Sequence, residues 1–333
     1  MIAVEGVRKR FGSLVAVDGL TFEVNRGEVV GFLGPNGAGK TTTMRMLTGT
    51  LQPDEGSVRF DGRAISEDLT AAKRRVGYLP ESNPLYDDML VAEYLEYVAQ
   101  LRDLPKEKSR SAIADSVEET GASEVFYRPI GELSKGFRQR VGMTAAILHG
   151  PEILILDEPT EGLDPNQRVD IRRLVVALGR ERTVLLSTHV MQEVEATCSR
   201  LLILRKGKLV AEGSVAALLS QRQGTARYVA EIEGEGVEEA LASLPGVQRV
   251  DAAPTDGRLR VQLEASGEGE LRPVIFGLAR ERSWVLWELH REHASLEQLF
   301  RELTREGAGV VDEAVAESVV AADGASDAGD SAP

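Results

Sequence analysis

The chain has 333 residues, a formal net charge of -14 at pH 7 and 42% hydrophobic residues. This length allows two domains, and the acidic balance argues against a broad nucleic-acid-binding surface, which normally presents a basic face. The single cysteine, Cys198, excludes an intrachain disulfide and a four-cysteine zinc site and favours a reducing compartment. No signal-peptide pattern and no apolar run of about 20 residues is present, so we expect a soluble protein, for which any membrane role must come through a partner.

Residues 1–219 alternate apolar strand-like runs with helical patterns, which is typical of an α/β domain. Within this domain the character changes at about residues 88–150. Helical periodicity is clear over Val91–Leu101 and again over Ser111–Val117. We therefore predict a helical insertion between strands of the domain.

Residues 34–41 read GPNGAGKT and fill every fixed position of a phosphate-binding loop. The preceding Glu28–Leu33 predicts a buried strand, and the residues from Thr41 onward predict a helix. That order directs backbone N–H groups and a helix dipole at one point, which suits a polyphosphate. Lys40 can reach the β- and γ-phosphates, and Thr41 can offer its hydroxyl to Mg²⁺. We expect a nucleotide and Mg²⁺ to bind at Gly34, Pro35, Asn36, Gly37, Ala38, Gly39, Lys40, Thr41 and Thr42.

Four aliphatic residues at 153–156 end in the acidic pair Asp157-Glu158. Such a run predicts a central parallel strand, and α/β sheets place their chemistry at the carboxyl ends of these strands. Asp157 would hold Mg²⁺ and Glu158 would polarise or deprotonate the attacking water. Alone, the pair could equally be two solvated acids, but the phosphate-binding loop upstream favours the functional interpretation.

The remainder of the chain predicts a linker at 220–226 and a small α+β domain at 227–307. Its predicted order is β-α-β-β-α-β, which fits a ferredoxin-like fold. Trp284 and Trp287 fall in its last strand, on opposite faces unless a bulge intervenes, and we expect both to pack. A final helix is predicted at 295–303, with Ser295 as its N-cap. Residues 308–333 carry six acidic residues and no basic ones, which predicts disorder.

Three further motifs indicate a family. Residues 133–140 read LSKGFRQR shortly before the acidic strand, residues 161–165 read EGLDP, and His189 follows a predicted strand over Thr183–Ser187. Together with the phosphate-binding loop and Asp157-Glu158, this ordered set resembles the ABC-type ATPases over essentially all of residues 1–219. The resemblance implies a phosphate-loop NTPase fold of ABC type.

The resemblance also implies a site shared between two copies of the chain. In this family two nucleotide-binding domains pack head to tail, and each ATP lies between the phosphate-binding loop of one and the signature of the other. Ser134 and Gly136 would contact the γ-phosphate in trans, and His189 would contact it in cis. Asp164 would bridge the dimer, and Phe11 would stack on adenine. The alternatives are a solvated loop histidine at 189 and a core aromatic at 11.

The chain departs from the family pattern at three positions. Glu81 stands where the family has a glutamine that reaches Mg²⁺ and the attacking water, and Lys135 and Phe137 alter the signature. A carboxylate can still coordinate Mg²⁺, so Glu81 counts as a candidate catalytic and metal residue. These departures, with GYLPE at 77–81, resemble the gliding-motility-associated group of type 2 exporter ATPases, whose membrane subunits are separate polypeptides.

The function implied by this resemblance is an ATP-hydrolysing subunit of a membrane exporter. Its expected partners are a separate transmembrane permease subunit and a second copy of itself, without nucleic acid and without direct membrane insertion. Its expected location is cytoplasmic, peripheral on the inner face of the cell membrane. Two alternatives are a soluble ABC ATPase that acts on ribosomes or DNA and an ATP-dependent regulatory module without transport.

Overall fold

The computed structural model describes residues 2–220, 225–266, 269–292, 296–297 and 299–300. The chain divides into two compact units, the first reaching Val215 and the second beginning at Ala216. The division falls at the start of helix α8 (Val215–Ser220), slightly before the boundary at 219 expected from the sequence.

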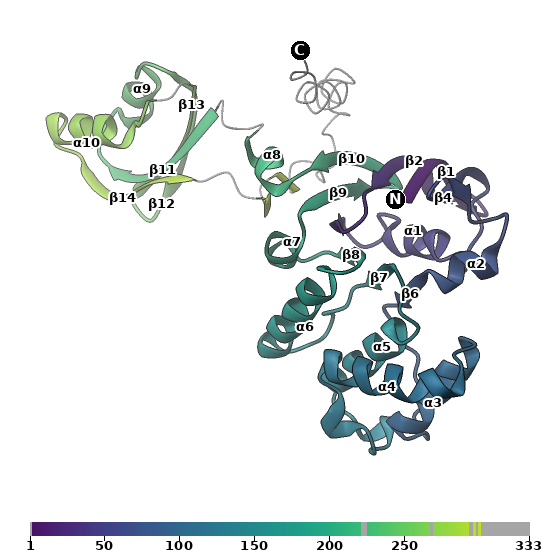
Figure 1. Cartoon of the computed structure of the whole chain (residues 1–333). Coiled ribbons are helices and arrows are strands. Elements are labelled where there is room, and N and C mark those ends of the chain that lie inside the picture. Colours follow the sequence, from purple (N-terminus) through teal and green to yellow (C-terminus); the bar gives the residue numbers. More distant parts are fainter. Residues whose placement is uncertain (1, 221–224, 267–268, 293–295, 298, 301–333) are drawn as a thin grey trace, which may run out of the picture. The chain divides into compact units, whose positions relative to one another are not determined.

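A six-stranded sheet forms the centre of the first unit (Figure 1). Its strand order is β10-β9-β3-β8-β7-β6, and every pairing is parallel except that of β9 with β10. The aliphatic runs of β3, β7, β8 and β9 are buried on both faces, as expected for a parallel sheet covered by helices, whereas the edge strand β10 is only partly buried. The strands are β3 (Val29–Leu33), β6 (Val76–Leu79), β7 (Ile153–Asp157), β8 (Thr183–Thr188), β9 (Arg200–Arg205) and β10 (Lys208–Gly213).

A second, antiparallel sheet of four strands completes the core of this unit. The sequence pattern does not anticipate it. Phe22 from this sheet meets Phe32 of β3 edge to face, with ring centroids 5.2 Å apart, and Met44 of α1 is buried in the same cluster. The elements here are β1 (Ile2–Phe11), β2 (Leu14–Val24), β4 (Glu55–Phe60), β5 (Arg63–Ala64), α1 (Lys40–Leu47) and α2 (Leu69–Arg74).

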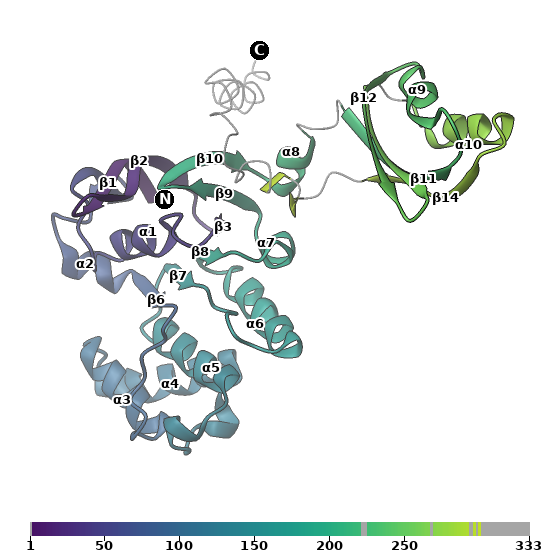
Figure 2. The ribbon, with the colours of Figure 1, turned by 180° about the vertical axis from the view of Figure 1, so that it is seen from behind.

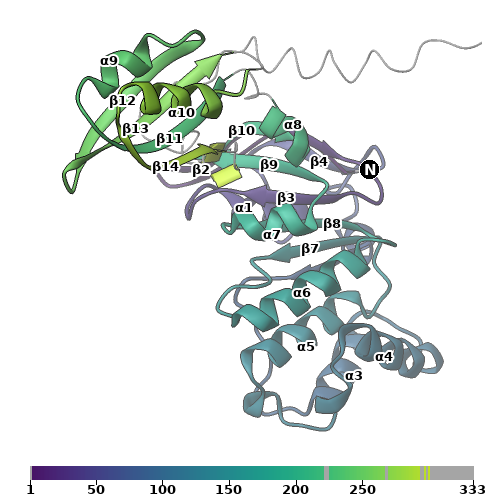
Figure 3. The ribbon, with the colours of Figure 1, turned by 90° about the vertical axis from the view of Figure 1, so that its left-hand side faces the viewer.

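The predicted helical insertion forms a layer with a core of its own. Helices α3 (Val91–Leu101), α4 (Lys106–Thr120) and α5 (Lys135–Ile147) gather at the end of the unit away from β1, β2 and β4 (Figure 3). Their shared core includes Leu95, Val117 and Val141. Helices α6 (Pro165–Leu178) and α7 (Met191–Thr197) follow β7 and β8. The insertion is therefore tied to the sheet through α5, which leads directly into β7.

The second unit has the β-α-β-β-α-β order expected from the sequence. Its antiparallel sheet runs β12-β13-β11-β14, and α9 and α10 lie together on one face of it (Figure 2). The elements are β11 (Thr225–Glu233), α9 (Val237–Ala242), β12 (Val247–Thr255), β13 (Arg258–Ser266), α10 (Arg272–Glu281) and β14 (Val285–Glu292). Most of the linker, most of the predicted helix at 295–303 and the acidic stretch at 308–333 lie outside the described residues.

The two tryptophans of the second unit behave differently from one another. Trp284 is buried, and its Nε1 donates to the Glu235 carbonyl oxygen at 3.1 Å. Trp287 is 53% exposed, and its ring packs against the Arg258 guanidinium, whose carbon lies 3.5 Å from the ring centroid. The pairing of β14 with β11 shifts register beside Trp287, because Glu231 pairs with Glu288 and Ile232 pairs with Leu286.

Candidate functional site

The phosphate-binding loop lies where β3 ends and α1 begins, as its sequence predicts. Gly39 has a φ of 102°, and a Cβ there would come 2.6 Å from the Ala16 carbonyl oxygen. A larger residue would therefore be both strained and obstructed. Lys40 Nζ turns back over the loop and donates to the Gly34 carbonyl oxygen at 2.7 Å. The Lys40 side chain therefore bonds back to Gly34, the first residue of the loop.

Asp157 lies at the carboxyl end of β7 with no exposed surface. Its Oδ1 accepts hydrogen bonds from the Ser187 hydroxyl and from the Thr41 hydroxyl, the latter at 3.3 Å. Its Oδ2 is buried and has no hydrogen-bond partner among the described residues. An unpartnered carboxylate oxygen beside a threonine hydroxyl fits a Mg²⁺ ion, which prefers hard oxygen ligands.

The described residues bring no three His, Cys, Asp or Glu side chains together as a metal site. A Mg²⁺ ion at Asp157 would therefore draw further ligands from phosphate oxygens and water, as this ion usually does beside nucleotides.

Glu158 contacts both Lys40 and His189. Its Oε1 is 3.3 Å from Lys40 Nζ, and its Oε2 is 3.0 Å from His189 Nδ1. The Glu158 side chain is only 7% exposed, whereas His189 is nearly half exposed. The backbone holds Glu158 at a φ of 48°, an uncommon conformation for a non-glycine residue, and its N–H donates to the Ser187 carbonyl oxygen at 3.1 Å. Strain of this kind at a buried carboxylate is typical of a functional position.

Glu81 follows β6 and lies close enough to the acidic pair to interact with it electrostatically. Partial burial raises the pKa of the Glu81 carboxyl, and the nearby carboxylates of Glu161, Asp157 and Glu158 raise it further. The structure therefore brings Glu81 to the site formed by the phosphate-binding loop, Asp157, Glu158 and His189.

Four other predicted residues are positioned by β1, α5 and α6. Phe11, at the end of β1, is 49% exposed and so is not a core aromatic. Ser134 and Asp164 are exposed N-cap residues, and each accepts a hydrogen bond from the first turn of its own helix, α5 or α6. Gly136 packs against the Gln167 side chain, which a Cβ at this position would meet at 2.9 Å. The signature residues are thus held by α5 and α6 rather than by the phosphate-binding loop of the same chain.

Sequence reasoning does not assign a role to Ser187. This residue lies near the end of β8, donates its hydroxyl to Asp157 and accepts from the Glu158 N–H at 3.0 Å. It therefore fixes both acidic residues from the neighbouring parallel strand. A polar residue at the carboxyl end of an otherwise aliphatic strand is the signal that could have found it.

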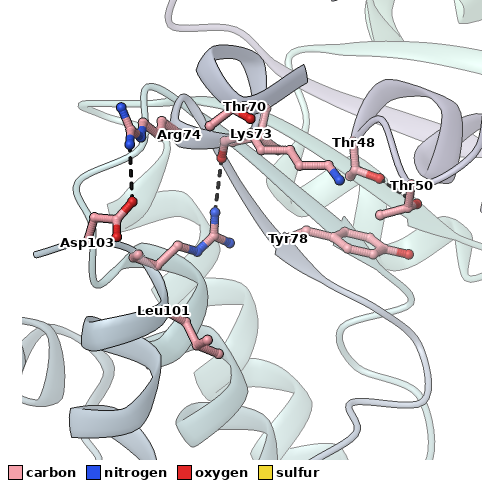
Figure 4. Close-up of a pocket in the computed structure, with 10 residues that line it drawn as sticks. Thr48, Thr50, Thr70, Lys73, Arg74, Tyr78, Leu101 and Asp103 are labelled. Carbon is pink, nitrogen blue, oxygen red and sulfur yellow. Dashed lines mark hydrogen bonds and ion pairs between the residues drawn. The ribbon is translucent and has the colours of Figure 1, made fainter. Parts of the chain in front are cut away.

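A cavity of about 380 Å³ opens between the α/β core and the helical insertion (Figure 4). Its wall includes Lys73 of α2, Tyr78 of β6, and Leu101 and Arg102 at the end of α3. Arg102 donates to the Lys73 carbonyl oxygen at 3.0 Å and so joins α3 to α2. Burial raises the pKa of Tyr78 to about 12, with the Asp157 carboxylate as a further cause. The cavity is thus one strand away from the acidic pair.

The family model described as ABC transporter matches residues 17–161 of the chain. The Nod factor export ATP-binding protein I of Ralstonia nicotianae (strain ATCC BAA-1114 / GMI1000) is 38% identical over 256 residues, covering 76% of this chain and 79% of that protein. The linearmycin resistance ATP-binding protein LnrL of Bacillus subtilis (strain 168) is 31% identical, covering 91% of this chain and 98% of that protein.

Among solved structures, an ATP-binding subunit of an ABC transporter superimposes with a TM-score of 0.60 at 27% identity. The match covers 66% of this chain and 92% of that one. The names of the two relatives do not support the finer resemblance to the gliding-motility-associated group.

Proposed function

Because the chain belongs to the family of ABC transporter ATP-binding subunits and is an ABC ATPase, we propose that it drives an exporter. In this proposal, it acts through a separate transmembrane subunit. The names of two relatives support the direction of transport, since one is a Nod factor export protein and the other a linearmycin resistance protein. Among the described residues, no helix is long and apolar enough to cross a membrane.

The observation that carries the proposal is the position of Glu158 between Lys40 and His189. A bound triphosphate competes for the Lys40 ammonium and frees the Glu158 carboxylate to polarise the attacking water. His189, on the open side of Glu158, then faces the γ-phosphate. Mg²⁺, held by Thr41, Asp157 and Glu81, would neutralise charge on the phosphate oxygens.

The exposed predicted residues support a composite site between two copies of the chain. Ser134 and Asp164 are both exposed, so a second molecule can reach them, and the ring of Phe11 is exposed, so an adenine can stack on it. In the head-to-tail arrangement, Phe11 stacks on adenine and the α5 N-terminus at Ser134 and Gly136 faces the γ-phosphate of the partner's ATP. ATP then favours the closed dimer over the open one.

The surface around the end of α3 supports contact with the transmembrane subunit. Leu101 lines the cavity, and Tyr97 lies one turn before it on the same helix. The rings of Tyr97 and Tyr86 are exposed, and their centroids are 5.8 Å apart. An exposed aromatic cluster is typical of a protein-binding surface. The cavity lies between the helical insertion and β6. A segment of the transmembrane subunit that docks there would therefore move when the insertion moves.

The substitution Glu158→Gln tests the catalytic assignment. We expect ATP turnover to fall at least about 100-fold while ATP-bound dimers accumulate, because the amide keeps the shape of the site but cannot act as a base. Phosphate release and size-exclusion chromatography with ATP measure the two effects. Glu181→Gln, an exposed change elsewhere in the same unit, is the matched control. Wild-type turnover in Glu158→Gln would contradict the assignment of the base.

Co-purification tests the partner. We expect a polytopic membrane protein to be recovered with the full chain, and Leu101→Asp to reduce that recovery without altering ATP turnover of the isolated chain. Recovery of ribosomes or DNA instead would favour a soluble ABC ATPase. An absence of phosphate release from the purified wild-type chain would favour a regulatory module.

A further inference from the structure

Helix α7 carries a buried carboxylate that the site described above does not use. Glu193 is only 4% exposed. Its Oε2 accepts two hydrogen bonds, from the Thr160 hydroxyl at 2.6 Å and from the Thr188 hydroxyl at 3.0 Å. Its Oε1 is buried and has no hydrogen-bond partner within the described part of the chain.

The two threonines belong to two different segments of the site. Thr160 lies two positions after Glu158, in the turn that leads to α6, and Thr188 immediately precedes His189. Thr188 Oγ1 also accepts from the Val190 N–H at 3.1 Å, so its hydroxyl fixes the loop beyond His189 as well. A single carboxylate oxygen is therefore the common anchor of the Glu158 segment and the His189 segment.

Packing alone does not account for this residue. A buried carboxylate with one unpartnered oxygen costs more free energy than an apolar side chain of similar size in the same place. Hydrogen bonds from hydroxyls to a carboxylate are short and strong, and a buried environment strengthens them further. The arrangement thus favours defined geometry of the two segments at the expense of stability.

We propose that Glu193 is a positioning residue for ATP hydrolysis, which holds the Glu158 and His189 segments in register through Thr160 and Thr188. The Glu158 Oε2 to His189 Nδ1 distance of 3.0 Å is the geometry that this anchor maintains. The inference deepens the proposed function and rests on its assignment of Glu158 and His189. Glu193 reaches the site through the two threonines, which carry its hydrogen bonds.

The substitutions Glu193→Leu and Glu193→Gln test this role in the full-length chain. Leu removes the acceptor, whereas the Gln side chain keeps a carbonyl oxygen for both hydroxyls. We expect Glu193→Leu to lower kcat about 10- to 100-fold with the KM for ATP within about threefold, since misplacing a catalytic group costs rate while the phosphate-binding loop is untouched. Glu193→Gln should retain most of the wild-type kcat. Glu195→Leu, an exposed change on the same helix, is the matched control.

A second measurement does not depend on ATP turnover. Hydrogen exchange at the Val190 amide should accelerate in Glu193→Leu and not in Glu193→Gln, because the Thr188 hydroxyl that holds this amide loses its anchor. This readout tests Glu193 even where the assignment of Glu158 fails. If Glu193→Leu is poorly folded, the single variant Thr160→Val, which removes one of the two contacts and leaves the Thr188 hydroxyl bonded to Glu193, should show a smaller loss of kcat in the same direction.

Two outcomes would overturn the proposal. One is a folded Glu193→Leu chain with kcat within about twofold of wild type and unchanged exchange at Val190. The other is an equal loss of kcat in Glu193→Gln and Glu193→Leu, which would mean that the negative charge, rather than the two hydrogen bonds, matters at this position.

Discussion

The two units of the chain handle their charged side chains in different ways. In the first unit, Lys40, Asp157 and Glu158 are buried at the carboxyl ends of parallel strands, and one oxygen of Asp157 has no partner among the described residues. In the second unit, the charges on the open sheet face pair across strands. Arg227 lies 2.6 Å from Glu264, and Arg258 lies 3.7 Å from Glu231.

This difference distinguishes the charged groups of a functional site from those of an ordinary solvent-exposed surface. Burying charge without full pairing costs stability, so such groups persist where chemistry needs them. Exposed pairs cost little and contribute little. The first unit therefore carries the strained and partly unsatisfied groups expected of an ATPase, whereas the charges of the second unit are those of a solvated sheet. Substitutions in both units can break or support this contrast.

Lys40→Met should have the greatest consequence, about a 1000-fold loss of ATP turnover. The substitution removes the ammonium that faces the phosphates and leaves Glu158 without its cation. Steady-state phosphate release measures this loss. Lys108→Met, on the exposed face of α4, is the control and should keep wild-type turnover. Less than about a tenfold loss in Lys40→Met would mean that the buried charges of the first unit do not form a functional cluster.

The sequence predicts local elements well and long-range pairing poorly. The helix expected at Val91–Leu101 has those same bounds, because a helix is indicated by its own periodicity. The antiparallel sheet of β2, β1, β4 and β5 is not anticipated, since it is assembled by the pairing of β1 with β4, which joins residues far apart in the chain, such as Ile2 and Phe60. Glu193 escapes sequence reasoning for the same reason, because Thr160 becomes its neighbour only once β7 and β8 are paired. The roles of the candidate site residues stay predictions.

Trp284→Ala should destabilise the second unit by about 3 kcal/mol or more. The ring is buried against Gly234 and its Nε1 is hydrogen-bonded, so the change leaves a cavity and removes that hydrogen bond. Urea denaturation followed by the fluorescence of the remaining Trp287 measures the loss. Trp287→Ala, followed through Trp284, is the matched control and should cost under about 1 kcal/mol. ATP turnover should be unchanged in both variants, because every candidate site residue lies in the first unit.

Because of His149, the free energy of unfolding of the first unit should fall by about 2 kcal/mol as the pH is lowered from 7 to about 4.5. Burial, with the nearby positive charge of Arg102, lowers the pKa of His149 from 6.5 to about 4. Between these values the unfolded chain binds a proton that the folded chain does not. The contribution of the neutral histidine to the free energy of unfolding is therefore complete above about pH 6.5. It is lost as the pH falls toward 4.

The control for this effect is His149→Gln, which can still donate to the Val76 carbonyl oxygen, the group that His149 Nε2 contacts at 3.1 Å. Urea denaturation followed by circular dichroism should show a stability that varies less with pH in the variant than in wild type. Tryptophan fluorescence serves as an internal reference, because Trp284 and Trp287 both lie in the second unit. Identical pH profiles for the two chains would show that the histidine is not held neutral.

Arg258→Ala should cost least, about 0.5–1 kcal/mol in the second unit. The guanidinium carbon lies 3.5 Å from the centroid of the Trp287 ring, but the ring is exposed and the ion pair with Glu231 is loose, so water compensates for most of what is lost. Denaturation followed by tryptophan fluorescence measures the cost, and Arg258→Lys, which keeps the cation, should lie between wild type and Arg258→Ala. A loss above about 2 kcal/mol would show that this cation supports the fold, and the contrast between buried functional charge and dispensable surface charge would then fail at this position.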